Sequence, residues 1–339
     1  MAHNFEEVKY TRTQVKKAGK LFVSDKATPN EKEDALDIIN NWRAAHSFPM
    51  QVIYMHVKRS AGPQAVVAQR LKRLYSITQK LYRFPNMSLT AMQDIGGCRV
   101  IVDSIEDVYN LVSGLKNSRM RHKLKEEYDY IQKPKEDGYR SYHIVYSYNS
   151  EKNSKYNGLF VEIQIRTHIQ HLWATAVETM DTFTGDPLKI GQGDPENRRF
   201  FVLVSQLFEI YEASNQSIDE VKQSDILQEF IEYEKTHQIL RKLKSIKLAV
   251  GYVQSVDYLD QGYFVLRLDR GRNQLLIKPY AKSQLERATI EYDLAEKNRS
   301  KNEDIVLVST ASFNMLKKAY PNYFTDINEF IRLVDSFIE

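Results

Sequence analysis

An alternating segment near the middle of the chain carries an acid that could act as a base or a metal ligand. In Val161–Thr167, strand alternation would place Glu162, Gln164 and Arg166 on one face and apolar side chains on the other. A carboxylate, an amide and a guanidinium side by side are costly to bury unpaired, so they indicate a ligand-filled cleft. A half-exposed edge strand is the alternative.

A second acid precedes the apolar run Ile95–Val102. Asp94 would lie at the mouth of a strand, where a carboxylate is well placed to bind Mg²⁺. Gly96 and Gly97 would let the backbone approach a ligand or a neighbouring strand closely. The alternative is a helix-to-strand turn in which Asp94 is a capping residue.

Cations precede that acid. If residues 64–82 form a helix, Lys72, Ser76 and Lys80 form one stripe at i, i+4 and i+8, close to Arg70. Cationic groups and a hydroxyl along one face could hold a polyphosphate without a glycine loop. Taken alone, an amphipathic helix with a basic outer face is the simpler interpretation.

A polar, aromatic segment, Asp129–His143, combines a turn with groups that could bind a nucleotide. Pro134 and Gly138 predict the turn, and Tyr139 could stack on a base. Lys135 and Arg140 could meet phosphate. A solvated hairpin loop would not usually concentrate so many such groups.

The pattern of apolar residues predicts the elements that carry these segments. We expect helices over 30–47, with Pro49 marking the exit, and over 64–82, 106–115 and 168–180; strands are expected over 95–102, 142–148 and 159–165. Mixed strands covered by helices predict an α/β or α+β fold, that is, a mixed β-sheet flanked by helices.

The remainder of the chain predicts a helical stretch and then a smaller α/β module. Residues 198–248 carry apolar residues at helical spacing, and strands over 262–268 and 274–277 flank the hairpin signal Asp269–Arg272. Further along, we expect a strand running into a helix over 285–298, a strand over 304–309, a helical turn over 313–318 and a closing helix over 326–337.

Bulk composition narrows the class of protein. The 339 residues, 27% of them charged, suit a water-soluble globular chain, and we expect neither a membrane span nor a leader peptide. Cys98 is the one cysteine, which excludes an intramolecular disulfide and a thiolate zinc site and suits the cytoplasm. Any metal should therefore have oxygen ligands.

The net charge of +4 argues against a general nucleic-acid binder, although residues 116–125 form a basic run that could contact phosphate.

Taken together and in this order, the four segments resemble the RelA/SpoT alarmone-synthetase domain, over roughly residues 35–180. The resemblance implies a nucleotidyltransferase-like synthetase domain that uses ATP and Mg²⁺. The implied ATP-binding residues are Arg70, Lys72, Ser76, Lys80 and Arg99. The implied metal ligands and catalytic acids are Asp94 and Glu162, Glu162 being a second metal ligand, a general base, or both. The implied acceptor-binding residues are Lys135, Tyr139, His143, Gln164 and Arg166.

Two departures from the family pattern bear on function. No His-Asp dipeptide occurs, so the family's hydrolase half is not expected, and Glu126–Tyr128 does not match the basic version of the family's acceptor segment. The fused C-terminal module, with Tyr320 and Tyr323 in a Tyr-x-x-Tyr element, resembles CapRel-type toxin–antitoxin fusions. That resemblance implies that Tyr320 and Tyr323 cap the ATP site until a phage protein binds the module; plain aromatic packing is the alternative.

The resulting expectation is an ATP-dependent pyrophosphokinase with three parts: a synthetase domain (1–195), a helical connector (196–250) and a C-terminal regulatory module (251–339). The expected acceptor is the 3′-terminal adenosine of tRNA, which would make the chain a translation-blocking toxin in phage defence. One alternative is a GTP or GDP pyrophosphokinase that makes an alarmone. The other is a non-catalytic nucleotide-binding regulator.

Overall fold

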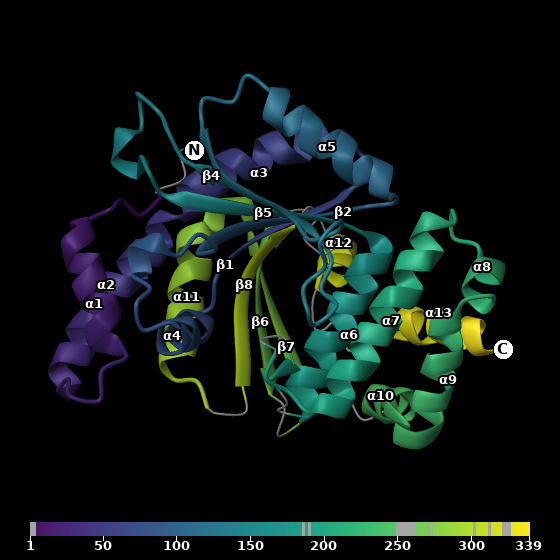
Figure 1. Cartoon of the computed structure of the whole chain (residues 1–339). Helices are drawn as coiled ribbons and strands as arrows, with labels where there is room; N and C mark the ends of the chain where they lie inside the picture. Colours follow the sequence, from purple (N-terminus) through teal and green to yellow (C-terminus); the bar gives the residue numbers. More distant parts are fainter. Residues whose placement is uncertain are drawn as a thin grey trace.

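A computed structural model describes residues 5–184, 187–188, 191–248, 262–269, 272, 274–300, 303–310, 313–320 and 327–339. Its centre is one eight-stranded sheet with the strand order β3-β4-β5-β2-β1-β8-β6-β7 (Figure 1). The strands are β1 (Val66–Leu71), β2 (Gly96–Val102), β3 (Lys123–Asp129), β4 (Tyr142–Ser147), β5 (Phe160–Thr167), β6 (Gly262–Asp269), β7 (Gln274–Ala281) and β8 (Glu303–Thr310). The pair β2–β5 is parallel and the other pairs are antiparallel. The predicted mixed sheet flanked by helices is confirmed.

Helices surround this sheet. The α-helices are α1 (Arg12–Phe22), α2 (Pro29–Ala45), α3 (Ser47–Ala61), α4 (Leu74–Arg83), α5 (Ile105–Asn117), α6 (His168–Thr184), α7 (Pro195–Ala213), α8 (Ile218–Lys222), α9 (Asp225–His237), α10 (Ile239–Leu248), α11 (Leu285–Lys297), α12 (Phe313–Ala319) and α13 (Asn328–Ile338). Several start where the sequence supplies a cap: the side chains of Thr11, Thr28 and Ser104 open α1, α2 and α5 with capping boxes.

The two faces of the sheet have different partners. On one face, β-branched side chains of β2 and β5, such as Val100 and Ile163, pack beneath α3 and α5, which lie above the sheet in Figure 1. On the other face, Ala68 and Val308 pack with Leu316 and Tyr320 at α12. Because side chains alternate along a strand, the polar residues of β5 share this second face with α12.

The C-terminal strands continue the sheet of the N-terminal half. Gln69 and Arg70 of β1 pair with Ser309 and Val308 of β8, and β8 in turn pairs with β6. Helices α6, α7, α9 and α10 and the last helix, α13, share one apolar cluster that includes Phe208, Phe330 and Phe337. The division into three parts at residues 195 and 250 stays a prediction, but these parts share one sheet and one helical core.

Three predicted elements are wrong. Residues 64–82 are not one helix, because β1 ends at Leu71 and α4 begins only at Leu74. Pro49 does not mark a helix exit; it lies in the first turn of α3, where its missing N–H costs nothing. Residues 285–297 are entirely helical as α11, with no strand. None of the helices described is long and apolar enough to cross a bilayer.

A buried ion pair joins the N-terminal helices to the C-terminal module. Arg43 of α2 is 2% exposed; its guanidinium lies 3.5 Å from Asp293 of α11 and 4.7 Å from the ring centre of Tyr292. Burial raises the pKa of Asp293 although Arg43 opposes it. The charge on Arg43 therefore depends on α11 for compensation.

We predict that Asp293→Ala destabilises the chain by up to about 3 kcal/mol, because it leaves the buried Arg43 charge without its partner. The value lies at the low end for buried pairs because Asp293 keeps 32% of its side chain exposed. Urea unfolding measures it. Lys297→Ala, which breaks an exposed pair with Glu33, is the matched control and should change stability by under ~1 kcal/mol. Equal losses in both variants would contradict the prediction.

Candidate active site

The polar residues of β5 lie on one face, as their alternation predicts. Val161, Ile163 and Ile165 are fully buried beneath α3 and α5, whereas Glu162 and Gln164 are half-buried on the opposite face. The Gln164 side chain donates a hydrogen bond of 2.7 Å to Glu162 Oε2. The edge-strand alternative is wrong, because β5 lies between β4 and β2.

Asp94 is held by two lysines. Lys72 Nζ lies 2.6 Å from Asp94 Oδ2 and Lys80 Nζ lies 3.1 Å from Oδ1, all three side chains being partly buried. Burial alone would raise the pKa of Asp94, but the two ammonium groups hold it well below its usual range. Lys72 reaches this position from the link between β1 and α4, where its N–H donates to the Ile95 carbonyl. The predicted helical stripe is therefore wrong in its first member, although Ser76 and Lys80 do lie on α4.

Glu162 belongs to a hydrogen-bonded chain of three side chains. His143 Nδ1 lies 3.0 Å from Glu162 Oε1, and His143 Nε2 lies 2.8 Å from Tyr139 Oη. Burial opposes the charge on His143, but Tyr139 and Glu162 raise its pKa to about 9. Burial likewise opposes the charge on Glu162, but His143 lowers its pKa. At neutral pH, an imidazolium therefore donates to an ionised carboxylate and to a phenol oxygen.

Three guanidinium groups lie on this same face, on adjacent strands. Arg70 of β1 pairs in register with Gly97, which pairs with Glu162, and Arg99 of β2 pairs with Gln164. Arg99 and Arg166 are 7% and 2% exposed. Burial and the neighbouring Arg99 lower the pKa of Arg166 to about 9, and no residue that the structure describes accepts a hydrogen bond from its Nε. Such crowding of like charges suits a polyanionic ligand.

Tyr320, at the end of α12, lies against these cations. Its ring centre is 5.1 Å from the guanidinium carbon of Arg99 and 5.9 Å from that of Arg70, within cation–π range. Arg99 also donates a 2.7 Å hydrogen bond to the Ala319 carbonyl, and His171 of α6 lies 2.8 Å from the Lys318 carbonyl. Tyr320 is 1% exposed. Tyr323 lies outside the described residues.

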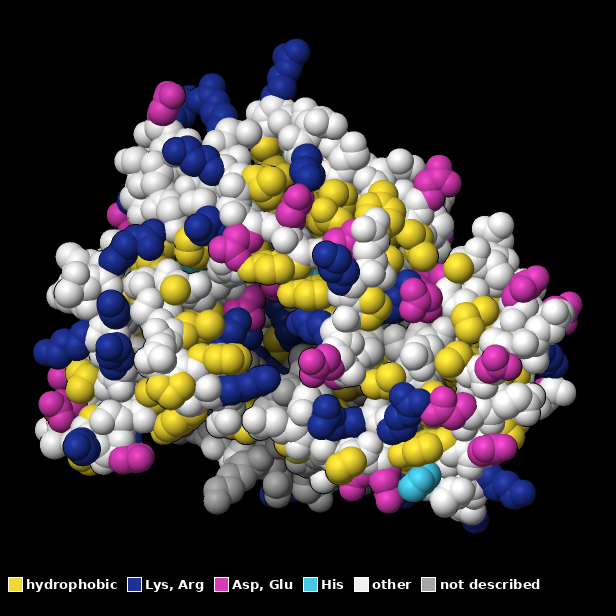
Figure 2. Space-filling model, viewed as in Figure 1, with side chains coloured by type: hydrophobic (Ala, Val, Ile, Leu, Met, Phe, Trp, Pro, Cys, Tyr) yellow, Lys and Arg dark blue, Asp and Glu magenta, His cyan; other side chains and the backbone are white. Residues whose placement is uncertain are grey.

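The space-filling view shows where these groups reach the surface. A hollow opens at the centre of the face in Figure 2, over the region between α4 and α6 in Figure 1, with Lys and Arg side chains at its base and acidic side chains beside them. The location matches the face that carries the acids and the guanidinium groups.

The segment before β4 brings aromatic groups to the same region. Lys135 Nζ lies 4.4 Å from the ring centre of Tyr130 and 5.1 Å from that of Tyr139. Tyr130 stacks parallel to the exposed Tyr128, with ring centres 5.8 Å apart, and packs edge-on against His143. Sequence analysis missed Tyr128 and Tyr130; their spacing of two residues around Asp129, at the end of an extended segment, was the available signal.

Arg140 does not face a phosphate site. Its side chain is 6% exposed and pairs with Glu212 of α7, with Nη1 3.1 Å from Oε2. The interpretation of Arg140 as a phosphate contact is therefore wrong: a buried carboxylate already neutralises it. Lys135, in contrast, is exposed.

Known proteins are similar in sequence to the segment of the chain that carries this site. The family described as "Region found in RelA / SpoT proteins" matches residues 69–181, from β1 to α6. The GTP pyrophosphokinase YwaC of Bacillus subtilis (strain 168) is 32% identical over 147 residues, which are 42% of this chain and 67% of YwaC. The chain belongs to the RelA/SpoT family.

Other relatives match over part of their length. The GTP pyrophosphokinase YjbM of the same organism is 35% identical over 122 residues, which are 35% of this chain and 57% of YjbM. The crystal structure of small alarmone synthetase 1 from Bacillus subtilis bound to its product pppGpp covers 47% of this chain and 79% of its own, with 28% identity and a TM-score of 0.38. Small alarmone synthetase 2 from the same organism covers 56% and 97%, with 24% identity and a TM-score of 0.41.

The two acids of this RelA/SpoT chain fit a hard cation. Asp94 lies two residues before the start of β2, and Glu162 lies near the start of the adjacent parallel strand β5, where it pairs in register with Gly97. Mg²⁺ is commonly held by one or two carboxylates together with substrate phosphates, so these two acids are the residues that would hold it. In the described part of the chain, no cluster of three or more His, Cys, Asp or Glu side chains could hold an ion.

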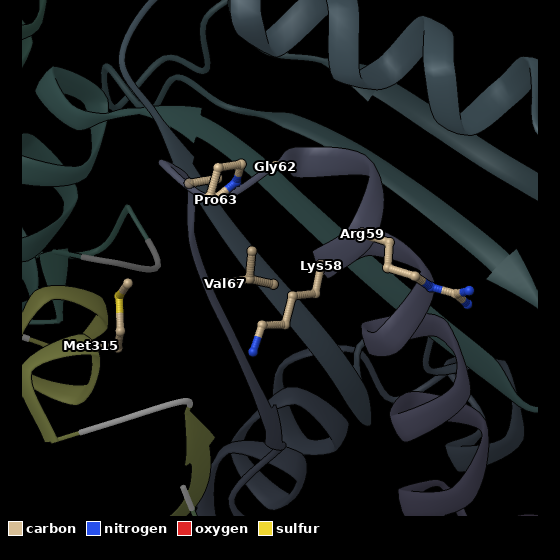
Figure 3. A pocket seen from close by; sticks show the side chains of 7 residues that line it. Lys58, Arg59, Gly62, Pro63, Val67 and Met315 are labelled. Carbon is tan, nitrogen blue, oxygen red and sulfur yellow. The ribbon is translucent and has the colours of Figure 1, made fainter. Parts of the chain in front are cut away.

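One cavity is set apart from the site. About 270 Å³ lies between the end of α3, the start of β1 and α12, with Val67 and Met315 on its walls (Figure 3). Lys58 extends along it, whereas Arg59 points outward. None of the predicted site residues lines this cavity.

The His143 pKa predicts how stability depends on pH. A folded pKa of about 9, above the usual 6.5, means that His143 binds its proton more tightly in the folded chain. Its contribution is fully present below pH 6.5 and is lost as the pH rises through 9. Urea unfolding of the parent and His143→Asn at pH 6, 7.5 and 9 should therefore give a stability difference that shrinks as the pH rises. A constant difference would show that folding does not shift the pKa of His143.

Proposed function

We propose that this RelA/SpoT chain transfers the β,γ-diphosphate of ATP to a ribose hydroxyl of an acceptor nucleotide. The observation that carries the proposal is geometric: by strand register, Arg70 and Arg99 share one face of the sheet with Glu162. Beside them, Asp94 holds Lys72 and Lys80 through ion pairs of 2.6 and 3.1 Å. The curated relatives YwaC and YjbM, both named GTP pyrophosphokinases, support the same reaction class.

The reaction forms one bond and breaks one. The acceptor hydroxyl oxygen attacks the β-phosphorus, the bond from that phosphorus to the α,β-bridging oxygen breaks, and AMP leaves with the electron pair. The proton of the hydroxyl passes to Glu162, which is ionised at neutral pH because His143 lowers its pKa. His143 and Gln164 fix the two oxygens of that carboxylate.

Charge neutralisation is the larger contribution in such a transfer. Arg70 and Arg99 would receive the triphosphate, with Lys72 and Lys80 close to Asp94. A Mg²⁺ ion between Asp94 and Glu162 would neutralise phosphate charge when bound. Tyr139 and Lys135 would bind the acceptor, and the ring of Tyr130 adds a second aromatic surface.

Tyr320 supports an inhibited state of the donor site. A buried phenol ring against Arg70 and Arg99 occupies the cations that the triphosphate needs. In this proposal ATP binds only after α12 and Tyr320 move away, and a protein partner of the C-terminal module, such as a phage protein, is the proposed trigger. Tyr323 would take part in the same cap.

The first candidate acceptor is a guanosine nucleotide, which the names of the curated relatives support. The second is the 3′-terminal adenosine of tRNA, which would make the chain a toxin that blocks translation. Two observations favour that second candidate: the parallel rings of Tyr128 and Tyr130 offer aromatic surface to bases, and Lys123, at the other end of β3, is exposed.

Transfer of label from γ-labelled ATP tests the reaction and its acceptor. The chain is incubated with Mg²⁺ and GDP, GTP or bulk tRNA; label on a guanosine nucleotide supports the first acceptor, and label on tRNA the second.

We predict that Glu162→Gln lowers transfer by at least ~10²-fold and Asp94→Asn similarly, with unchanged circular dichroism. Full turnover by either variant, or no label on any acceptor from the Tyr320→Leu form, contradicts the proposal.

We predict that Tyr320→Leu raises basal transfer and tightens ATP binding, because it removes the ring from Arg70 and Arg99. Isothermal titration with a non-hydrolysable ATP analogue measures the affinity. Tyr320→Phe keeps the ring and is the matched control, so it should behave like the parent; Tyr320→Ala/Tyr323→Ala should also raise toxicity to a host. If Tyr320→Leu and the parent bind the analogue equally well, the ring does not block the donor site.

A further inference from the structure

One buried carboxylate outside the family-matched segment contacts both the loop of residues 130–141, here called the acceptor loop, and the strand that carries Glu162. Glu212 lies near the end of α7, and 4% of its side chain is exposed. Its Oε2 accepts a 3.1 Å hydrogen bond from Arg140 Nη1 and a 3.3 Å hydrogen bond from Gln170 Nε2. Its Oε1 accepts from the hydroxyl of Thr167, the last residue of β5. Glu212 therefore touches the segment just before β4, the end of β5 and the first turn of α6.

The acceptor loop is pressed against the same helix. Gly138 has φ +87°, and a Cβ there would lie 3.0 Å from the Ser205 Cβ and 3.2 Å from the Trp173 ring, so both its conformation and its space require glycine. Ser205 Oγ donates a 2.6 Å hydrogen bond to the Gly138 carbonyl. The residual void between loop and helix is about 10 Å³, room for no more than one water. The backbone before Tyr139 is thus fixed by α7.

Arg140 depends mainly on Glu212 for a buried ion pair. Its second ion-pair partner among the described residues, Glu209, is 3.8 Å away with 48% of its side chain exposed, and no described residue accepts a hydrogen bond from Arg140 Nε. A buried guanidinium without its carboxylate is strongly unfavourable, so Arg140 stays where Glu212 holds it. Arg140 follows Tyr139 directly, and His143 lies three residues further on, hydrogen-bonded to Glu162.

We propose that Glu212 is a positioning residue for the acceptor: through Arg140 and Thr167 it sets the loop that carries Lys135 and Tyr139 against the strand that carries Glu162. The inference rests on the proposed diphosphate transfer for its kinetic meaning. Within the described part of the chain, the hydrogen bonds of Glu212 go to Arg140, Thr167 and Gln170, and not to Arg70, Asp94 or the other donor-side groups. Its loss therefore weakens acceptor binding and leaves ATP binding unchanged.

The test compares Glu212→Gln with Glu209→Gln, which neutralises the exposed neighbour of the same arginine. Both are made in the full chain carrying Tyr320→Leu and assayed with ATP, Mg²⁺ and either GDP or tRNA. Glu212→Gln should raise the acceptor KM at least tenfold, with the KM for ATP within twofold. Glu209→Gln should change neither. An equal rise in both KM values, or an unchanged acceptor KM, would overturn the positioning role.

A double-variant cycle identifies the route. If Glu212 acts through Arg140, adding Glu212→Gln to Arg140→Gln should raise the acceptor KM by much less than tenfold, because the charge to be neutralised is already gone. If the two substitutions raise the acceptor KM independently, so that their fold-changes multiply, Glu212 does not act through Arg140.

Hydrogen exchange separates this inference from the proposed function. In the parent background, Glu212→Gln should speed exchange of the amides of residues 138–141 about tenfold and leave α4 unchanged, while Glu209→Gln leaves both unchanged. A chain that labels no acceptor yet shows this exchange pattern refutes the transfer reaction and keeps the positioning role. A chain that transfers label but shows parent-like exchange in Glu212→Gln refutes the positioning role alone.

Discussion

The burial of positively charged arginine side chains is the feature that most constrains this structure. Arg70, Arg99 and Arg166 share one face of the sheet, and the charge of Arg99 helps to push the pKa of Arg166 down. Arg99 reaches a carboxylate, Glu178, only at 3.9 Å. The aromatic ring of Tyr320 and the last carbonyls of α12 supply the compensation instead. The C-terminal segment is therefore part of the electrostatic balance of the site as well as a neighbour of it.

Local patterns predicted the parts of the site that lie within one element. The alternation of Glu162, Gln164 and Arg166 identified their shared face, and the acid before Ile95–Val102 was recognised for its place at a strand entrance. The single helix predicted over residues 64–82 was wrong, because an apolar run followed by cations fits a strand and a helix equally well. The β-branched Val66 and Val67 after Pro63 were the signals for a strand.

Contacts between distant segments could not be read from the sequence. Arg140 and Glu212 are 72 positions apart, and nothing near Arg140 indicates that a helix would bury and neutralise it. The contact of Tyr320 with Arg70 and Arg99 was expected only from a family resemblance, not from the residues. That β6, β7 and β8 extend the first sheet also depends on a pairing of β1 with β8 that no local pattern encodes.

The junction between β1 and β8 has a consequence for shortened forms of the chain. In the described part of the chain two residue pairs make this junction, and one of them contains Arg70. The strand that joins the two halves of the sheet is therefore the strand that presents a donor-site cation. A fragment ending before β6 would leave the backbone of β1 as a free edge, which favours pairing with a second molecule. Self-association of such a fragment would then distort the part of the site that receives the triphosphate. Low transfer activity of the fragment would indicate aggregation and not the loss of a regulatory module.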